Sequence, residues 1–407
     1  MSRWSSLRPA LPILVGASVM LSLSMGLRQS LGILVPPLTR DIGISVSDFT
    51  IAVSIQNLAW GLLQPFAGAL AVRVGFRPLM LGGALLYILG MVLLATAQGL
   101  FGVVLGAGVA IGAALAATGS AVAMAAAARP VPAAARSLVL GIVSAAGSVG
   151  ALMAAPLAQT AVQAGTWRWG AATFVVLALF MLPAAWFGGS VDRLPPPPPP
   201  GGVSQSARQA LGTALRHAPF VVMAMAYFVC GMQLVFLTTH LPTYLDVCGM
   251  DPMLAAQALA MIGGFNVLGS LFFGWAGGHV NKQALLGMIY VLRSLMFVWY
   301  FHAGPTPGST LVFAGAMGFL WLGVAPLVSG WIAQTFDLRW QAMLAGVAFC
   351  GHQLGSFLGA FGGGLAYDRL GSYTLAWQVG ATLGLAAGLV QLFAAFTLKS
   401  GPPRLAV

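Results

Sequence analysis

The chain has 407 residues, of which 59% are hydrophobic and only 6% are charged, so the usual soluble mixture with roughly 25% charged residues is excluded. All seven acidic residues are aspartates, and this excludes functions that need a glutamate ligand or base, such as the zinc-protease motif His-Glu-x-x-His. The formal charge of +11 comes from basic residues scattered singly and in pairs between apolar runs, which excludes the continuous basic patch of a nucleic-acid-binding protein.

Apolar segments of about 20 residues, the length that crosses a bilayer, follow one another along the chain. Arg3 and Arg8 precede the first one as in a signal peptide, but its apolar run is too long for such a segment. We therefore expect an uncleaved first span. Charges and turn residues bound the segments and predict twelve transmembrane helices, at residues 11–38, 49–72, 78–98, 101–127, 137–163, 168–190, 218–245, 254–279, 283–302, 310–333, 342–366 and 374–398.

The longest polar interruption, residues 191–217, separates the first six predicted spans from the last six. It contains six consecutive prolines, from Pro195 to Pro200, which favour an extended, semi-rigid spacer. The sequence thus predicts an all-α membrane protein with an N-terminal six-helix half (1–190), a Pro-rich linker (191–217) and a C-terminal six-helix half (218–407).

The distribution of lysine and arginine between alternate loops predicts the orientation, because these residues accumulate on the cytoplasmic side. Placing the N-terminus inside puts thirteen basic residues in the cytoplasm and three outside. Both termini and the linker are therefore expected to be cytoplasmic. The inside set is Arg3, Arg8, Arg73, Arg77, Arg129, Arg136, Arg193, Arg208, Arg216, Lys282, Arg339, Lys399 and Arg404, and the outside set is Arg40, Arg168 and Arg369.

Arg28 lies inside the first predicted span, far from either end. An ionisable residue in the membrane usually faces the bundle interior and marks a pathway. Its guanidinium can bind a carboxylate through two hydrogen bonds, so an anionic substrate is its natural partner. The alternative is a structural arginine that binds backbone carbonyls or extends to the membrane surface.

Arg293 lies near the middle of the ninth predicted span. No acidic residue is predicted at that depth, so its partners are expected to be carbonyls, hydroxyls or a ligand. Both substrate contact and structural support fit this position.

Two histidines also fall within predicted spans and are candidates for carrying a proton. His240 shares a helix face with Gln233, seven residues before it, and His352 is followed by Gln353. The alternative for each histidine is a satisfied hydrogen-bonding role in the core.

Further polar residues recur at helical spacing. Asn57, Trp60 and Gln64 form a stripe on the second predicted span, and Asn266 and Ser270 form a shorter one on the eighth. Such stripes either line a wet cavity or bond one helix to another. From these patterns, the candidate substrate-binding residues are Arg28, Asn57, Gln233, Asn266, Arg293 and Gln353.

No pattern indicates a cofactor or a metal. Neither G-x-G-x-x-G nor a P-loop is present among the 53 glycines, and the three cysteines show no C-x-x-C spacing. Transport driven by ATP binding to this chain is therefore not expected.

Residues 68–77, after the second predicted span, resemble the G-x-L-a-D-r-x-G-r-k loop of the major facilitator superfamily, and residues 274–279 resemble a second, poorer copy. The arrangement of twelve spans with a long central linker also resembles that of the superfamily. The resemblance implies two six-helix halves. Val72 stands where the family loop has an acid, so this chain lacks the charge on which the family's loop latch depends.

Within that superfamily the chain is most similar to the branch of monocarboxylate transporters and oxalate:formate antiporters. Residues 136–150 resemble the fifth-span signature of this branch, and residues 351–373 resemble its eleventh span and the following loop. Arg28 takes the place of the first-span lysine that serves substrate and proton coupling in the animal members. The eighth span departs from its relatives, because Asn266 and Ser270 stand in a segment that lacks the substrate-binding arginine.

The resemblance implies a secondary active transporter and not an enzyme. We expect it to move a small organic anion, namely a monocarboxylate, by alternating access and with proton symport. The expected location is a bacterial inner membrane, with the protein acting as a monomer without cofactor, metal or nucleic acid. The rival hypotheses are an exporter of amphipathic drugs or metabolites with the same fold, and a non-transporting membrane receptor or assembly factor.

Overall fold

The computed structural model describes residues 5–195 and 205–398 of the chain, and within these residues the regular secondary structure is helical. The helices form because a chain in hydrocarbon must satisfy its backbone hydrogen bonds internally. Five of the six prolines predicted to form an extended spacer, residues 196–200, lie outside the described residues.

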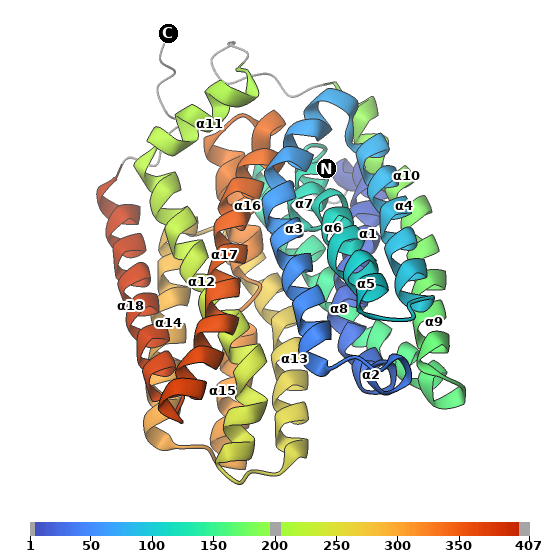
Figure 1. Ribbon diagram of the computed structural model, residues 1–407. Helices are drawn as coiled ribbons and strands as arrows, with labels where there is room; N and C mark the ends of the chain where they lie inside the picture. Colours follow the sequence, from blue (N-terminus) through green and yellow to red (C-terminus); the bar gives the residue numbers. More distant parts are fainter. Residues whose placement is uncertain (1–4, 196–204, 399–407) are drawn as a thin grey trace.

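The helices of each predicted half form one bundle, and the two bundles stand side by side (Figure 1). The first contains η1 (Ser5–Ala10), α1 (Leu11–Ser30), η2 (Leu31–Leu34), α2 (Val35–Ile42), α3 (Val46–Val74), α4 (Phe76–Ala95), α5 (Leu100–Val103), the π-helical η3 (Val104–Ala110), α6 (Ile111–Thr118), α7 (Ser120–Ala128), α8 (Ala133–Ala164), α9 (Trp167–Leu179), α10 (Met181–Gly188) and η4 (Gly189–Arg193). The second contains α12 (Ala218–Val247), α13 (Pro252–Ala276), α14 (Lys282–Ala303), α15 (Pro307–Phe319), α16 (Val324–Thr335), η6 (Leu338–Trp340), α17 (Gln341–Leu370) and α18 (Thr374–Thr397).

In the sequence between the two bundles, the predicted linker contains a short helix, α11 (Ala207–Arg216). The polyproline pattern did not predict this helix. The Ser206 side chain accepts a hydrogen bond from the Gln209 backbone, and the Gln209 side chain accepts one from Ser206 in return. This capping box starts the helix. α11 lies at the end of the molecule where α12 begins and α18 ends (Figure 1), and we call this end the linker face.

Eleven helical segments of the described residues are long and apolar enough to cross a membrane. The second predicted span, α3, is not among them although it has 29 residues, which is about 43 Å of helix. Gln56, Asn57 and Gln64 lower its hydropathy. Because α3 packs against α17 on one side and against η3 and α6 on the other, it serves as the twelfth helix of the fold. The prediction of an all-helical membrane protein with two six-helix halves is confirmed.

Two spans in equivalent positions of the halves are interrupted. The fourth breaks at Gly119, between α6 and α7, and the tenth breaks at residues 320–323, between α15 and α16. The sequence predicted both as continuous. In transporters built from repeats, discontinuous helices in corresponding positions mark the neighbourhood of the substrate site.

The two halves pack closely between α3 and α17 toward the linker face. Built on ideal geometry, a Cβ atom at Gly68 would lie 2.4 Å from the Met343 nitrogen. One at Gly346 would lie 2.8 Å from backbone atoms of Gln64 and Pro65. Glycine at these positions therefore lets the two helices meet with their backbones in contact.

We expect Gly346→Val to destabilise the protein, because its new side chain meets backbone that cannot move aside. Overpacking of this kind costs about 1–3 kcal/mol, and the thermal unfolding midpoint of the purified protein should fall. Gly362→Val is the matched control, since Gly362 is on the same helix and has open space where its Cβ would be. Equal midpoints for the two variants would contradict the close contact.

Candidate functional site

Arg28, on α1, is half-buried and faces α3. Its Nη2 donates a hydrogen bond of 2.5 Å to Asn57 Oδ1. Its guanidinium lies over the Trp60 ring, 5.3 Å from the ring centre. Asn57 and Trp60 are one turn apart on α3, so one face of that helix holds the arginine on two sides.

The same asparagine connects the two halves of the molecule. Gln353 Nε2, from α17, donates to the Asn57 carbonyl oxygen at 3.2 Å and lies 3.3 Å from Asn57 Oδ1. Gln353 Oε1 is in turn 3.2 Å from Nδ1 of His352. Arg28, Asn57, Gln353 and His352 therefore form one hydrogen-bonded chain that crosses from the first half to the second.

Aromatic rings line the side of this chain that belongs to the second half. Phe349 stacks on His352 with 5.4 Å between ring centres and 10° between planes, and Tyr227 packs on His352 at 4.7 Å. Phe349 also contacts Trp60 across the junction of the halves, at 4.5 Å. Charged and apolar surfaces thus lie next to each other at the site.

The charge of Arg28 has no acidic partner in the membrane interior. All seven aspartates lie in connections, at helix starts or in last turns, and the chain has no glutamate. The Arg28 Nε atom is buried and has no hydrogen-bond partner among the described residues. A half-buried cation with a free donor is suited to binding an anion.

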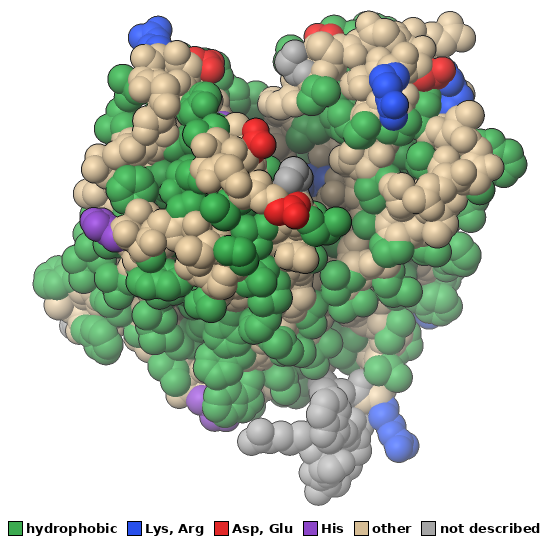
Figure 2. Space-filling model, turned by 90° about the horizontal axis from the view of Figure 1, so that it is seen from below, with side chains coloured by type: hydrophobic (Ala, Val, Ile, Leu, Met, Phe, Trp, Pro, Cys, Tyr) green, Lys and Arg blue, Asp and Glu red, His purple; other side chains and the backbone are tan. Residues whose placement is uncertain are grey.

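The face opposite the linker face is hollowed near its centre. Figure 2 looks onto this face and shows a lysine or arginine side chain in the floor of the hollow. The contacts between α3 and α17, by comparison, run from Asn57 and Gln353 toward the linker face. The two halves are therefore closely packed on the linker side of Asn57 and Gln353, and the molecule is recessed on the opposite face.

Gln233 and His240, both on α12, lie within the packing of the second half. Gln233 Nε2 donates to the Gly380 carbonyl at 2.9 Å and to Ser294 Oγ at 3.3 Å. His240 Nε2 lies 2.8 Å from the Ala360 carbonyl oxygen. The structure therefore does not bring these two residues together with Arg28.

Arg293, on α14, is fully buried against the break in the tenth span. Its Nε and Nη2 donate to the Leu320 carbonyl at 3.1 and 2.9 Å, and Nη2 also donates to the Trp321 carbonyl at 2.9 Å. Asn266 Oδ1 accepts from the Leu322 backbone N–H at 2.8 Å. These two side chains satisfy the backbone groups that the interruption of the helix leaves without partners.

Sequence reasoning singled out Trp60 but missed the aromatic rings that the second half contributes to the site. Phe349 is three residues before His352 and four before Gln353, so the three share a face of α17, and this spacing could have identified Phe349. Tyr227 had no such signal, because the residues one turn before and after it on α12 are apolar or small. As for metals, no group of three potential ligands is suitably placed within residues 5–195 and 205–398.

The family profile of the Major Facilitator Superfamily matches residues 14–360. Among curated proteins, the chain is similar to Monocarboxylate transporter 13 of Bos taurus, with 25% identity over 87% of this chain and 81% of the relative. It is 26% identical to Monocarboxylate transporter 11 of Homo sapiens, over 91% and 79% of the two chains. It is also 23% identical to the uncharacterized MFS-type transporter YcxA of Bacillus subtilis, over 86% of each chain.

Solved structures of the same fold include FucP in the outward conformation, with a TM-score of 0.76 and 14% identity over 96% of this chain and 99% of that one. The human organic anion transporter MFSD10 aligns with a TM-score of 0.74 and 14% identity, over 94% and 99% of the two chains. At 14% identity, the likeness of these two structures to this chain is one of fold alone.

Proposed function

Because the chain belongs to the major facilitator superfamily, whose members are transporters rather than enzymes, we propose that it carries a small organic monocarboxylate across the membrane by alternating access, together with a proton. In this mechanism two six-helix halves rock about a site between them. The monocarboxylate transporters among the relatives support the substrate class.

The observation that carries the proposal is Arg28 without an acidic partner. Its unpaired Nε and its Nη atoms can donate two parallel hydrogen bonds to one carboxylate. A substrate carboxylate would neutralise the only arginine in the hydrogen-bonded chain that joins the halves. Asn57 and Gln353 are positioned to orient the carboxylate, and through it the substrate would contact both halves.

The aromatic surface next to Arg28 suits the apolar part of such a substrate. Trp60, Phe349 and Tyr227 offer ring faces and edges within one side-chain length of the site. A carboxylate with a compact apolar or aromatic body therefore fits better than a sugar, which needs many hydrogen-bond partners.

We assign the remaining sequence candidates to support of the pathway. Arg293 and Asn266 hold the break in the tenth span, and Gln233 ties α12 to α14 and α18. For the proton we favour His352, because it belongs to the chain that contains Arg28. His240 and the substrate itself are the other possible carriers.

The linker face is proposed to be cytoplasmic, with both termini on that side of a bacterial inner membrane. The excess of arginine at the helix ends of this face supports the orientation. The recess in Figure 2 would then open to the outside. One buried core contains residues of both halves, which supports a monomer as the working unit.

The test is uptake into proteoliposomes containing the purified protein. Labelled lactate, pyruvate and an aromatic acid such as phenylacetate are offered with an imposed inward proton gradient. We expect at least one acid to accumulate above its external concentration, and a protonophore should abolish the accumulation. Protein-free liposomes correct for passive entry of the protonated acids.

The exporter hypothesis makes the opposite prediction. If none of the acids enters, and cationic or neutral amphiphiles bind to the protein instead, the cavity serves an apolar solute and the proposal is wrong. Uptake that is saturable but indifferent to the proton gradient would retain the substrate class and reject symport.

A further inference from the structure

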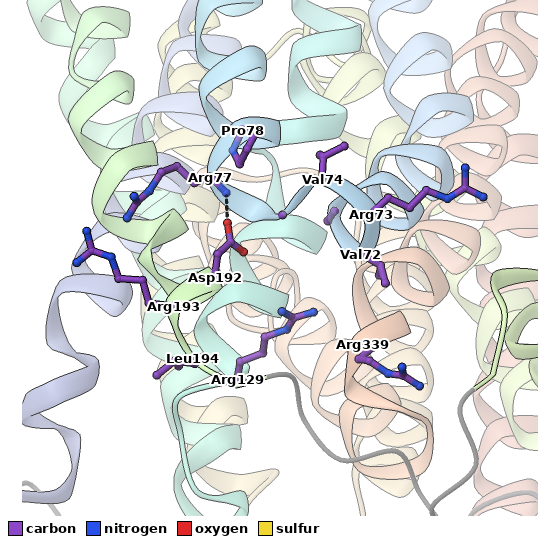
Figure 3. A pocket seen from close by; sticks show the side chains of 12 residues that line it. Val72, Arg73, Val74, Arg77, Pro78, Arg129, Asp192, Arg193, Leu194 and Arg339 are labelled. Atoms are coloured by element: carbon purple, nitrogen blue, oxygen red, sulfur yellow. Dashed lines mark hydrogen bonds between the residues drawn. The ribbon is translucent and has the colours of Figure 1, made fainter.

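A second pocket lies on the linker face, apart from the Arg28 site. Its volume is about 460 Å³, which is sufficient for a small ligand group. It is bounded by the end of α3, the start of α4, the residues after α7, η4 and η6 (Figure 3). Its lining residues are Ala71, Val72, Arg73, Val74, Gly75, Arg77, Pro78, Arg129, Asp192, Arg193, Leu194 and Arg339.

Positive charge predominates in this pocket, which we call the basic pocket. Five of its lining residues are arginines and one is an aspartate. Arg339 forms an ion pair with Asp337, with 2.6 Å between Nη2 and Oδ2. Even with that second carboxylate counted, arginine is in excess.

The single lining carboxylate is occupied by backbone groups. Asp192 Oδ1 and Oδ2 accept hydrogen bonds from the backbone N–H groups of Phe76 and Arg77, each at 2.8 Å. Figure 3 shows the bond to Arg77. Asp192 thereby caps the start of α4, where a negative charge also complements the helix dipole. Its two oxygens are thus engaged in the cap. One carboxylate beside five guanidinium groups leaves an excess of positive charge in the pocket, which an anion would balance.

Arg129 extends toward the middle of the pocket, between Asp192 and Arg339 in Figure 3. Its guanidinium lies over the Phe76 ring at 4.5 Å, and its buried Nε has no hydrogen-bond partner among the described residues. Burial lowers the pKa of Arg129, while Asp192 and Asp337 raise it. Stacking on a ring leaves the donor edge of a guanidinium available to a ligand.

The rim of the basic pocket is apolar and exposed. Val74 and Leu194 line it with exposed side chains, and the exposed Trp186 ring lies 4.3 Å under the Arg77 guanidinium. Tryptophan and exposed aliphatic residues beside arginines are typical of the level where lipid headgroups lie.

We propose that the basic pocket binds a phosphate group, carried either by the headgroup of an anionic lipid or by a soluble phosphate compound. A phosphate offers oxygens in several directions and can accept from more than one guanidinium at once, whereas a carboxylate offers two oxygens in one plane. Because Arg339 lines the pocket from the second half and the other arginines line it from the first, a bound phosphate would lie between the halves.

The test measures the thermal unfolding midpoint of the detergent-purified full chain during titration. The probes are phosphatidylglycerol, phosphatidylcholine and inorganic phosphate, the last compared with sodium chloride at equal ionic strength. We expect phosphatidylglycerol or inorganic phosphate to raise the midpoint with saturation. In Arg129→Gln, the half-saturating concentration should be at least about tenfold higher, because a bidentate charged contact is lost. Arg208→Gln, which removes an exposed charge from α11 on the same face, should behave as wild type.

The outcomes distinguish the sources. Saturation with phosphatidylglycerol and not with inorganic phosphate identifies a lipid headgroup, and saturation with both identifies a site for soluble phosphate. The proposal is overturned if neither probe stabilises the wild type, if phosphatidylcholine acts equally, or if Arg129→Gln responds as wild type. If Arg129→Gln does not fold, Arg193→Gln replaces it, because Arg193 is exposed and its loss leaves the helix packing intact.

Discussion

Replacing Arg28 by alanine is expected to lower the efficiency of carboxylate uptake by on the order of 10- to 100-fold. Hydrogen bonds to charged groups contribute about 1.5–3 kcal/mol, and each 1.4 kcal/mol is a factor of ten in binding. Arg28 is the one cation in the hydrogen-bonded chain between the halves, so no neighbour can replace it. The uptake efficiency of Arg28→Lys should lie between those of the wild type and Arg28→Ala, since lysine keeps the charge and loses the bidentate geometry.

The measurement is initial uptake into proteoliposomes against substrate concentration, at equal protein per vesicle. Arg369→Ala is the matched control, because it removes an exposed arginine from the last turn of α17. Its uptake should equal that of the wild type. Normal uptake by Arg28→Ala would falsify the assignment of the carboxylate site.

Replacing Arg293 by methionine is expected to destabilise the fold itself. The substitution fills a similar volume but leaves the carbonyls of Leu320 and Trp321 without the donor that binds them. A buried polar group without a partner costs about 1–3 kcal/mol, and two carbonyls are affected. The thermal unfolding midpoint should fall strongly, with Arg293→Lys intermediate because its ammonium can reach one of the carbonyls.

The readout is the unfolding midpoint without substrate, beside the substrate affinity of the protein that remains folded. Arg28→Met is the control for removing an intramembrane guanidinium, and its midpoint should stay close to that of the wild type. A stable Arg293→Met variant with weakened substrate affinity would instead make Arg293 a substrate-binding residue.

The positions of the spans were predictable because they depend on local composition. Apolar runs must form helices wherever they cross the membrane, and eleven of the twelve expected segments meet the hydropathy of a span. Arg28 was predictable too, since a charge within an apolar run requires a partner whatever its neighbours are.

The interruptions of the fourth and tenth spans were not predictable from local composition. The break at residues 320–323 exists because Arg293 and Asn266, from two other helices, satisfy its backbone groups. Asp192 is a similar case. It lies in a predicted linker, and only the packing of η4 against α4 makes it the cap of Phe76 and Arg77.

The sequence by itself determined a membrane protein with two six-helix halves, and it singled out the arginine on which the proposed site depends. Hydropathy, helical periodicity and charge distribution act over one or two turns, so they can be read from neighbouring residues. Only the tertiary structure decided that Asn57 and Gln353 join Arg28, while Gln233 and Arg293 serve the interior of the second half. Partners 296 residues apart, such as Asn57 and Gln353, meet because of the way helices pack, and no local pattern encodes that choice.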